Sequence, residues 1–152
     1  MNLFRILLFL SAISVVSGLS AQKPGKDIKA AINRFFEGMA NGDTVLLKSA
    51  CTDSMVLQTV RTGPDGRVWV ETENFREFVH FVGAPRTDAY LEKIKFGAIH
   101  VEKSLASVWT PYVFYLNGKI RHCGTNSFQL IHTEAGWKIQ YIIDTRRRDG
   151  CQ

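Results

Sequence analysis

The feature that most constrains the fold is an Asn117-Gly118 dipeptide between two segments rich in β-branched and aromatic residues, 107–116 and 119–132. Asn-Gly is the strongest short-range signal for a two-residue β-hairpin, because both residues tolerate the positive φ angles that such a turn requires. A second reversal, Thr-Glu-Ala-Gly, leads into the segment 137–145. The last third of the chain is therefore predicted to form three strands joined by consecutive antiparallel hairpins.

Helical patterns occupy the earlier part of the chain. Apolar residues recur at helical spacing over 27–41, 44–51 and 72–82, and Asp43 and Thr72 are placed to cap the second and third of these helices.

Short β-favouring segments complete the order of elements. Segments 55–60 and 67–71 flank a Pro-Asp-Gly turn, and 90–102 is interrupted by Gly97, which suggests a β-bulge. The order ααββαββββ predicts an α+β domain in which helices cover one face of a curved mixed or antiparallel sheet.

Three segments carry a resemblance to a known superfamily: AINRFFEGMANGD (31–43), VWTPYVFYLNGKIRHCGTNSFQLI (108–131) and GWKIQYIIDTRRRDGC (136–151). They resemble the nuclear transport factor 2-like superfamily, whose cone-shaped fold is shared by ketosteroid isomerase, scytalone dehydratase and SnoaL-like cyclases. The C-terminal part most resembles exported bacterial members whose domain is named for lumazine binding. The resemblance implies a single cone with three helices, a cavity and frequent dimers, but no particular activity.

The first 21 residues are typical of a secretory signal. Arg5 precedes an apolar run, and small residues precede Gln22, so cleavage is expected after Ala21. We therefore predict a signal peptide at 1–21, a single domain at 22–152, and a periplasmic or secreted protein without stable membrane insertion after cleavage.

Charge and histidine spacing argue against several partner classes. The net charge of +5 is mild, and the basic run 146–148 has no interleaved aromatic residues, so nucleic acid is not an expected partner. The four histidines and three cysteines show no metal-binding spacing. We expect neither a metal nor an organic cofactor.

Three cysteines in an exported chain predict one disulfide and one free thiol. Cys51 ends an apolar helix and is expected to be buried and free. Cys123 and Cys151 can meet if the chain turns back at Asp149-Gly150, so we predict that they are bonded, with free thiols as the alternative.

The neighbours His122 and Cys123 should point to opposite faces of a strand, which argues against a thiol–imidazole pair. Regular pairing through Asn117-Gly118 places Trp109 opposite Asn126, on the face of His122. If that face is concave, Trp109, His122 and Asn126 line a ligand cavity. The alternative is that the aromatic residues are core and His122 and Asn126 only bond to neighbours.

The last strand and the end of the second helix supply further residues whose positions can be predicted. Alternation turns Trp137, Ile139, Tyr141 and Ile143 toward the helices, with Asp144 on the other face. Asp53, which follows the second helix, could act as a general base with His122 or a tyrosine hydroxyl as proton donor. Alternatively, it could be an ordinary turn residue.

Three functions remain open at this point. The leading hypothesis is an exported, non-catalytic domain that binds a small molecule in the cone. The second is an isomerase, cyclase or dehydratase that uses general acid–base chemistry without a cofactor. The third is a module for protein interaction or homodimerisation through the outer face of the sheet.

Overall fold

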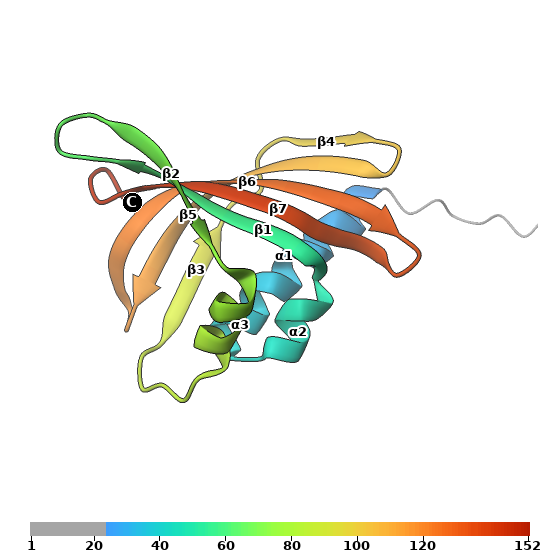
Figure 1. Cartoon of the computed structure of the whole chain (residues 1–152), viewed down its shortest axis with the longest axis horizontal. Coiled ribbons are helices and arrows are strands. Elements are labelled where there is room, and N and C mark those ends of the chain that lie inside the picture. The colour runs from blue at the N-terminus through green and yellow to red at the C-terminus, as the bar shows by residue number, and fades with distance from the viewer. Residues whose placement is uncertain (1–23) are drawn as a thin grey trace, which may run out of the picture.

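The computed structural model describes residues 24–152, so the predicted signal segment 1–21 lies outside the described residues. Residues 24–152 form three helices and seven strands (Figure 1). In chain order these are α1 (Pro24–Asn41), α2 (Thr44–Ser49), β1 (Cys51–Thr62), β2 (Val68–Glu73), α3 (Phe75–Gly83), β3 (Tyr90–Ile94), β4 (Ile99–Glu102), β5 (Leu105–Leu116), β6 (Lys119–Thr133) and β7 (Gly136–Arg147).

The strands of this part of the chain form one mixed sheet in the order β2-β1-β7-β6-β5-β3, with β4 also paired to β5. β1 and β7 run parallel, and the other pairs are antiparallel. The sheet arches over the three helices, which all lie on its concave side (Figure 1). The predicted α+β architecture, with helices on one face of a curved mixed sheet, is confirmed.

The hairpins of the last three strands follow the prediction from Asn117-Gly118. Asn117 and Gly118 have φ angles of 52° and 76°, the left-handed conformation expected for this turn. The cap at Asp43 is also confirmed, because its Oδ1 accepts hydrogen bonds from the backbone N–H groups of Val45 and Leu46 at 3.0 and 2.9 Å.

Two assignments at the ends of helices differ from the prediction. β2 continues to Glu73, so the cap of α3 is Asn74 rather than Thr72, and its Oδ1 accepts from the N–H groups of Arg76 and Glu77. Cys51 begins β1 instead of ending α2. Its thiol is free and buried, as predicted, and burial raises its pKa.

Apolar side chains fill the end of the sheet next to the β6–β7 turn, which we call the packed end. Ile28 and Ile32 of α1 meet Phe128 and Leu130 of β6 there, and none of the four is exposed to solvent. Trp137 and Ile139 are buried in the same core, as alternation predicts. This layer fixes α1 against the sheet.

Two β-bulges change the register of the last three strands. In β6, Arg121 is the extra residue, because Ile120 lies opposite Tyr115 and His122 lies opposite Phe114. In β7, Gln140 is extra, between Ile139 and Tyr141. The bulge at Arg121 shifts β5 by one position against β6, and the bulge at Gln140 moves the following residues of β7 to the face opposite to the one that regular alternation predicts.

Candidate functional site

The other end of the sheet, beside the β5–β6 turn and the C-terminus, encloses a cavity of about 510 Å³ between the sheet, α1 and α3. We call it the open end. Aromatic and aliphatic side chains form most of its wall: Phe35, Phe36, Met39, Leu57, Phe78, Phe81, Val82, Tyr90, Phe114, Leu116 and Ile142. A cavity of this size and lining is suited to a small molecule with an apolar body.

A row of polar residues crosses the concave face where the packed end gives way to the open end. Thr59 of β1 lies opposite Asp144 of β7, Asp144 opposite Asn126 of β6, and Asn126 opposite Thr110 of β5. All four are buried. Opposite residues share a face, so this row marks the depth at which the wall becomes polar.

Asp144 is the centre of the hydrogen-bonded network in this row. Its Oδ1 accepts from Thr59 Oγ1 at 2.6 Å, and its Oδ2 accepts from Tyr112 OH at 2.7 Å and Arg146 Nε at 2.9 Å. Burial, and then the negative charge of Asp144, raise the pKa of Tyr112, so its hydroxyl stays a hydrogen-bond donor. These three hydrogen bonds hold the carboxyl group of Asp144 in a defined orientation.

Tyr112 reaches Asp144 because Gly124 lies between them. Gly124 sits opposite both Tyr112 and Arg146 in the sheet. A Cβ at Gly124 would lie 1.8 Å from the carbonyl oxygen of Thr145 and 3.1 Å from Cε1 of Tyr112. Only glycine leaves room for β7 and the tyrosine ring at this position.

Glu92 of β3 supplies a second carboxyl group to the cavity wall. Asn126 Nδ2 donates a hydrogen bond to Glu92 Oε1 at 2.8 Å. Loss of solvent around the carboxyl group raises the pKa of Glu92 to about 7, although the bond from Asn126 acts in the opposite direction. Near neutral pH this group can therefore give or take a proton.

His122 and Asn126 both line the cavity, on the inward face that the sequence predicts for them. The ring of His122 stacks on Phe114 with centroids 4.8 Å apart. Burial, followed by the positive charge of Arg146, lowers the pKa of His122 to about 4. The imidazole is therefore neutral at pH 7, and the titration near 6.5 that an unperturbed histidine would show is not expected.

Trp109 does not lie where alternation places it. It pairs with Ser127 rather than Asn126, is 53% exposed, and is absent from the lining of the cavity. The bulge at Arg121 is the cause, because the extra residue shifts β5 by one position against β6 and turns Trp109 to the outer face. Thr110 takes the place opposite Asn126.

The candidate base Asp53 is exposed on β1, beside α3, and is not part of the main cavity. The acidic residues of the cavity that sequence reasoning missed are Glu73, Glu92 and Asp144. Asp144 was assigned to the outer face, but the bulge at Gln140 turns Ile142, Asp144 and Arg146 inward. Tyr141 and Ile143, assigned to the helix side, accordingly point outward.

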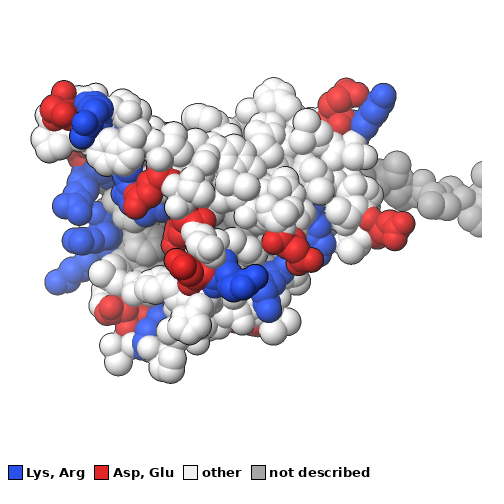
Figure 2. All heavy atoms as spheres, viewed as in Figure 1, with Lys and Arg blue, Asp and Glu red and all other residues white. Residues whose placement is uncertain are grey.

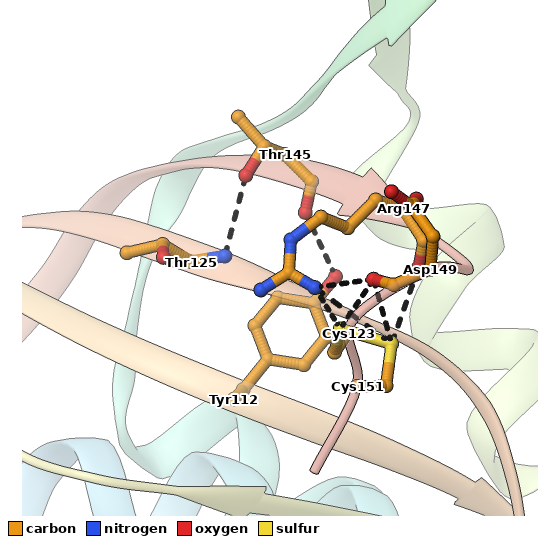
Figure 3. Close-up of a disulfide and its surroundings, with 7 residues drawn as sticks. All are labelled: Tyr112, Cys123, Thr125, Thr145, Arg147, Asp149 and Cys151. Atoms are coloured by element: carbon orange, nitrogen blue, oxygen red, sulfur yellow. Dashed lines mark hydrogen bonds between the residues drawn. A yellow bond between two sulfur atoms is a disulfide. The ribbon is translucent and has the colours of Figure 1, made fainter.

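The disulfide between Cys123 and Cys151 is confirmed, with a Cα–Cα distance of 5.5 Å. The disulfide lies on the face of β6 opposite to His122. Cys123 therefore bonds the C-terminal segment, whereas its neighbour His122 lines the cavity. Figure 3 shows the guanidinium of Arg147 over the two sulfur atoms, where Nη1 donates to the carbonyl oxygen of Asp149 at 2.7 Å. The bond and this arginine hold the C-terminal turn against β6 beside the cavity opening.

Neither a metal cluster nor a membrane-spanning helix is found in residues 24–152. No group of three or more histidine, cysteine, aspartate or glutamate side chains in this range is arranged to hold a metal ion. No helix in the same range is long and apolar enough to cross a membrane.

No protein-family model and no curated protein matches this chain. Solved structures do match it. An NTF2-like protein with a cystatin-like fold from Novosphingobium aromaticivorans is 14% identical with a TM-score of 0.64, covering 84% of this chain and 83% of that one. An NTF2-like protein of unknown function from Shewanella baltica is 13% identical with a TM-score of 0.62, covering 82% of this chain and 94% of that one.

The chain has the NTF2-like fold. A proposed dehydratase of the NTF2-like family from Streptomyces avermitilis is also similar, with 19% identity, a TM-score of 0.57, and coverage of 83% of this chain and 99% of that one. At these identities the similarity establishes the NTF2-like architecture and leaves the chemistry to be argued from the residues of the cavity.

Proposed function

We propose that the protein is an exported domain that binds a small molecule inside the NTF2-like cone. The observation that carries this proposal is the cavity of about 510 Å³, with mostly apolar walls and a polar row of fixed orientation at its inner end. Apolar walls provide contact area, while a few placed polar groups select the orientation of the ligand. His122 and Asn126 are the predicted ligand contacts, and Glu92, Tyr112 and Asp144 join them.

Export is supported by the disulfide, because such bonds persist mainly in oxidising compartments. The secretory pattern of residues 1–21 supports it independently. Western blotting of fractionated host cells tests this part of the proposal. Recovery of full-length protein with both cysteines reduced in the cytoplasmic fraction would contradict it.

The ligand itself is best sought by native mass spectrometry of protein purified from its own host. We expect a mass adduct that is absent when Leu57→Trp fills the cavity, since Leu57 is a half-buried lining residue. The resemblance to domains named for lumazine binding makes a flat heteroaromatic ring the first compound class to add back. A folded parent that never acquires any such compound would overturn the proposal.

The same spectra report the homodimer that we propose for the outer face of the sheet. Trp109 and Leu105 are 53% and 51% exposed on the outward side of β5. Exposed large apolar groups of this kind favour association. We expect Trp109→Asp to shift the spectrum from dimer to monomer, whereas a parent protein that is monomeric at micromolar concentration would end the idea.

General acid–base catalysis is a second candidate, favoured by Glu92. Its pKa of about 7 suits proton transfer at neutral pH, and Asp144 and the neutral His122 lie in the same cavity wall. Glu92 replaces Asp53 as the candidate base. His122 would then offer a hydrogen bond rather than a mobile proton.

Comparison of the parent with Glu92→Gln separates catalysis from binding alone. If the protein is an enzyme, the variant should retain a compound that differs from that in the parent by an isomerisation or by one water. If both retain the same unchanged compound, the catalytic candidate is wrong and the binding proposal stands.

A further inference from the structure

Positive charge gathers at the opening of the cavity. Five arginines contribute to its lining: Arg61, Arg121, Arg146, Arg147 and Arg148. Figure 2 shows basic side chains concentrated at the end of the molecule that carries the C-terminus and the β5–β6 turn. The field of such a group favours an anion at the opening.

The partners of these arginines separate them into two kinds. Arg61 is paired with Glu71 at 2.6 Å, Arg146 with Asp144 at 2.9 Å, and Arg147 holds the disulfide loop through Asp149. Arg121 and Arg148 form no ion pair or side-chain hydrogen bond with any residue in the described range 24–152. These two guanidinium groups are therefore available to a ligand.

A solvated strand exit would explain 146–148 alone, but not Arg121. Arg121 comes from the bulge of β6, far from that run in the sequence, and yet lines the same cavity. Positive charge from Arg146, Arg61 and Arg121 also contributes, after burial, to the lowered pKa of His122. Three strands, β1, β6 and β7, thus bring positive charge to one opening.

The inner part of the cavity has the opposite character. The carboxylate of Asp144 and the carboxyl group of Glu92 lie along its wall, so an anionic group would be repelled from this depth. The same cavity is also lined by the aromatic rings of Phe35, Phe36 and Phe114. A matching ligand carries its charge at one end only.

We propose that the ligand is an amphiphilic anion, whose apolar body lies against the phenylalanines while its carboxylate, phosphate or sulfonate group is held by Arg121 and Arg148. Guanidinium groups bind such oxyanions through paired hydrogen bonds. This inference rests on the proposed small-molecule function and adds the charge and the orientation of the ligand.

A matched pair of fluorescent probes tests it. 8-Anilinonaphthalene-1-sulfonate and N-phenyl-1-naphthylamine share one ring system, and only the first carries a negative group. Each probe is titrated into the parent protein, into the double variant Arg121→Gln/Arg148→Gln, and into the control Arg67→Gln, an exposed arginine in the β1–β2 turn. Circular dichroism verifies that the three proteins are folded alike.

We expect the double variant to bind the sulfonate about tenfold more weakly, with less than a twofold change for the neutral probe. Sulfonate binding to the parent should also weaken as salt is added. Competition by decanoate and by decyl phosphate then distinguishes a carboxylate from a phosphate head group.

Two other outcomes overturn different statements. If both probes bind parent and double variant alike, or lose affinity equally, the anionic ligand is wrong and the small-molecule function stands. If neither probe binds the folded parent, the proposed function itself fails, and this inference fails with it.

Discussion

The packed end and the open end of the cone are built by the same three strands, β5, β6 and β7, yet they have opposite properties. At the packed end, Val108, Phe128 and Ile139 are fully buried among the helices. At the open end, Phe114 and His122 on the same strands are only half-buried and face a cavity. The difference shows that the helices pack tightly against one end of the sheet and leave a cavity at the other.

The two ends also differ in what stabilises them. Dispersion and loss of apolar surface from water hold the packed end. The open end depends on the hydrogen bonds around Asp144 and on the disulfide between Cys123 and Cys151. Substitutions made at one end only therefore test this difference.

The largest expected effect comes from equivalent truncations at the two ends. Phe128→Ala removes a ring with no solvent exposure and should lower the free energy of unfolding by about 3–5 kcal/mol. Phe114→Ala enlarges an existing cavity and should cost about 1–2 kcal/mol. Urea unfolding measures both, and equal losses would mean that the open end is packed as tightly as the other.

Removal of the disulfide should act on the open end. Because the bond closes a span of 28 residues, the double variant Cys123→Ala/Cys151→Ala should lose about 3–4 kcal/mol. In the folded variant, amide chemical shifts should change near 121–125 and 144–152, while those of Leu130 and Ile139 stay constant. Changes spread evenly over both ends would contradict the division between them.

Glu92 should give the open end a dependence on pH. The folded protein holds the proton of Glu92 up to about pH 7, whereas the unfolded chain releases it near 4.5, so stability is lost as pH rises from 4.5 to 7. Relative to Glu92→Gln, the parent should lose about 2–3 kcal/mol across this window.

Thermal or urea unfolding at pH 4.5 and pH 8 measures this difference. Glu102→Gln, at an exposed position in β4, is the matched control and should follow the parent at both pH values. A parallel response of the parent and Glu92→Gln would show that this carboxyl group is solvated.

The smallest effect is expected on the outer face. Trp109→Ala should change the free energy of unfolding of the monomer by less than about 1 kcal/mol, since more than half of the side chain is exposed there. Binding of both naphthalene probes should stay within twofold of the parent. Weaker binding would place the ligand, or a contact that shapes the cavity, on the outside of the sheet.

The same contrast explains how much the sequence could predict. The packed end follows regular alternation, so Trp137 and Ile139 were assigned to the core, and Asn117-Gly118 gave the hairpin. The disulfide followed from the compartment and from a turn at Asp149-Gly150. These signals are local, and each involves a residue type with a strong conformational or chemical preference.

The open end could be predicted only in part, because it lies beyond the bulges. His122 and Asn126 were assigned to the correct face, whereas Trp109 and Asp144 were not. The extra residues, Arg121 and Gln140, have no intrinsic preference for a bulge, unlike glycine. Gln140 is held by tertiary bonds to Thr52 and Ser54 of β1, which a single strand cannot reveal.

The central place of β7 has a consequence for how the protein is made. This strand is the last element of the chain, yet it lies between β1 and β6 and connects the two halves of the sheet. Thr59 and its bonded partner Asp144 are 85 residues apart. Until β7 has been synthesised, β1 is paired only with β2, and the two halves of the sheet cannot join. We therefore expect the sheet to fold slowly, only after β7 has been synthesised. Aggregation through the exposed edge of β1 is the competing reaction.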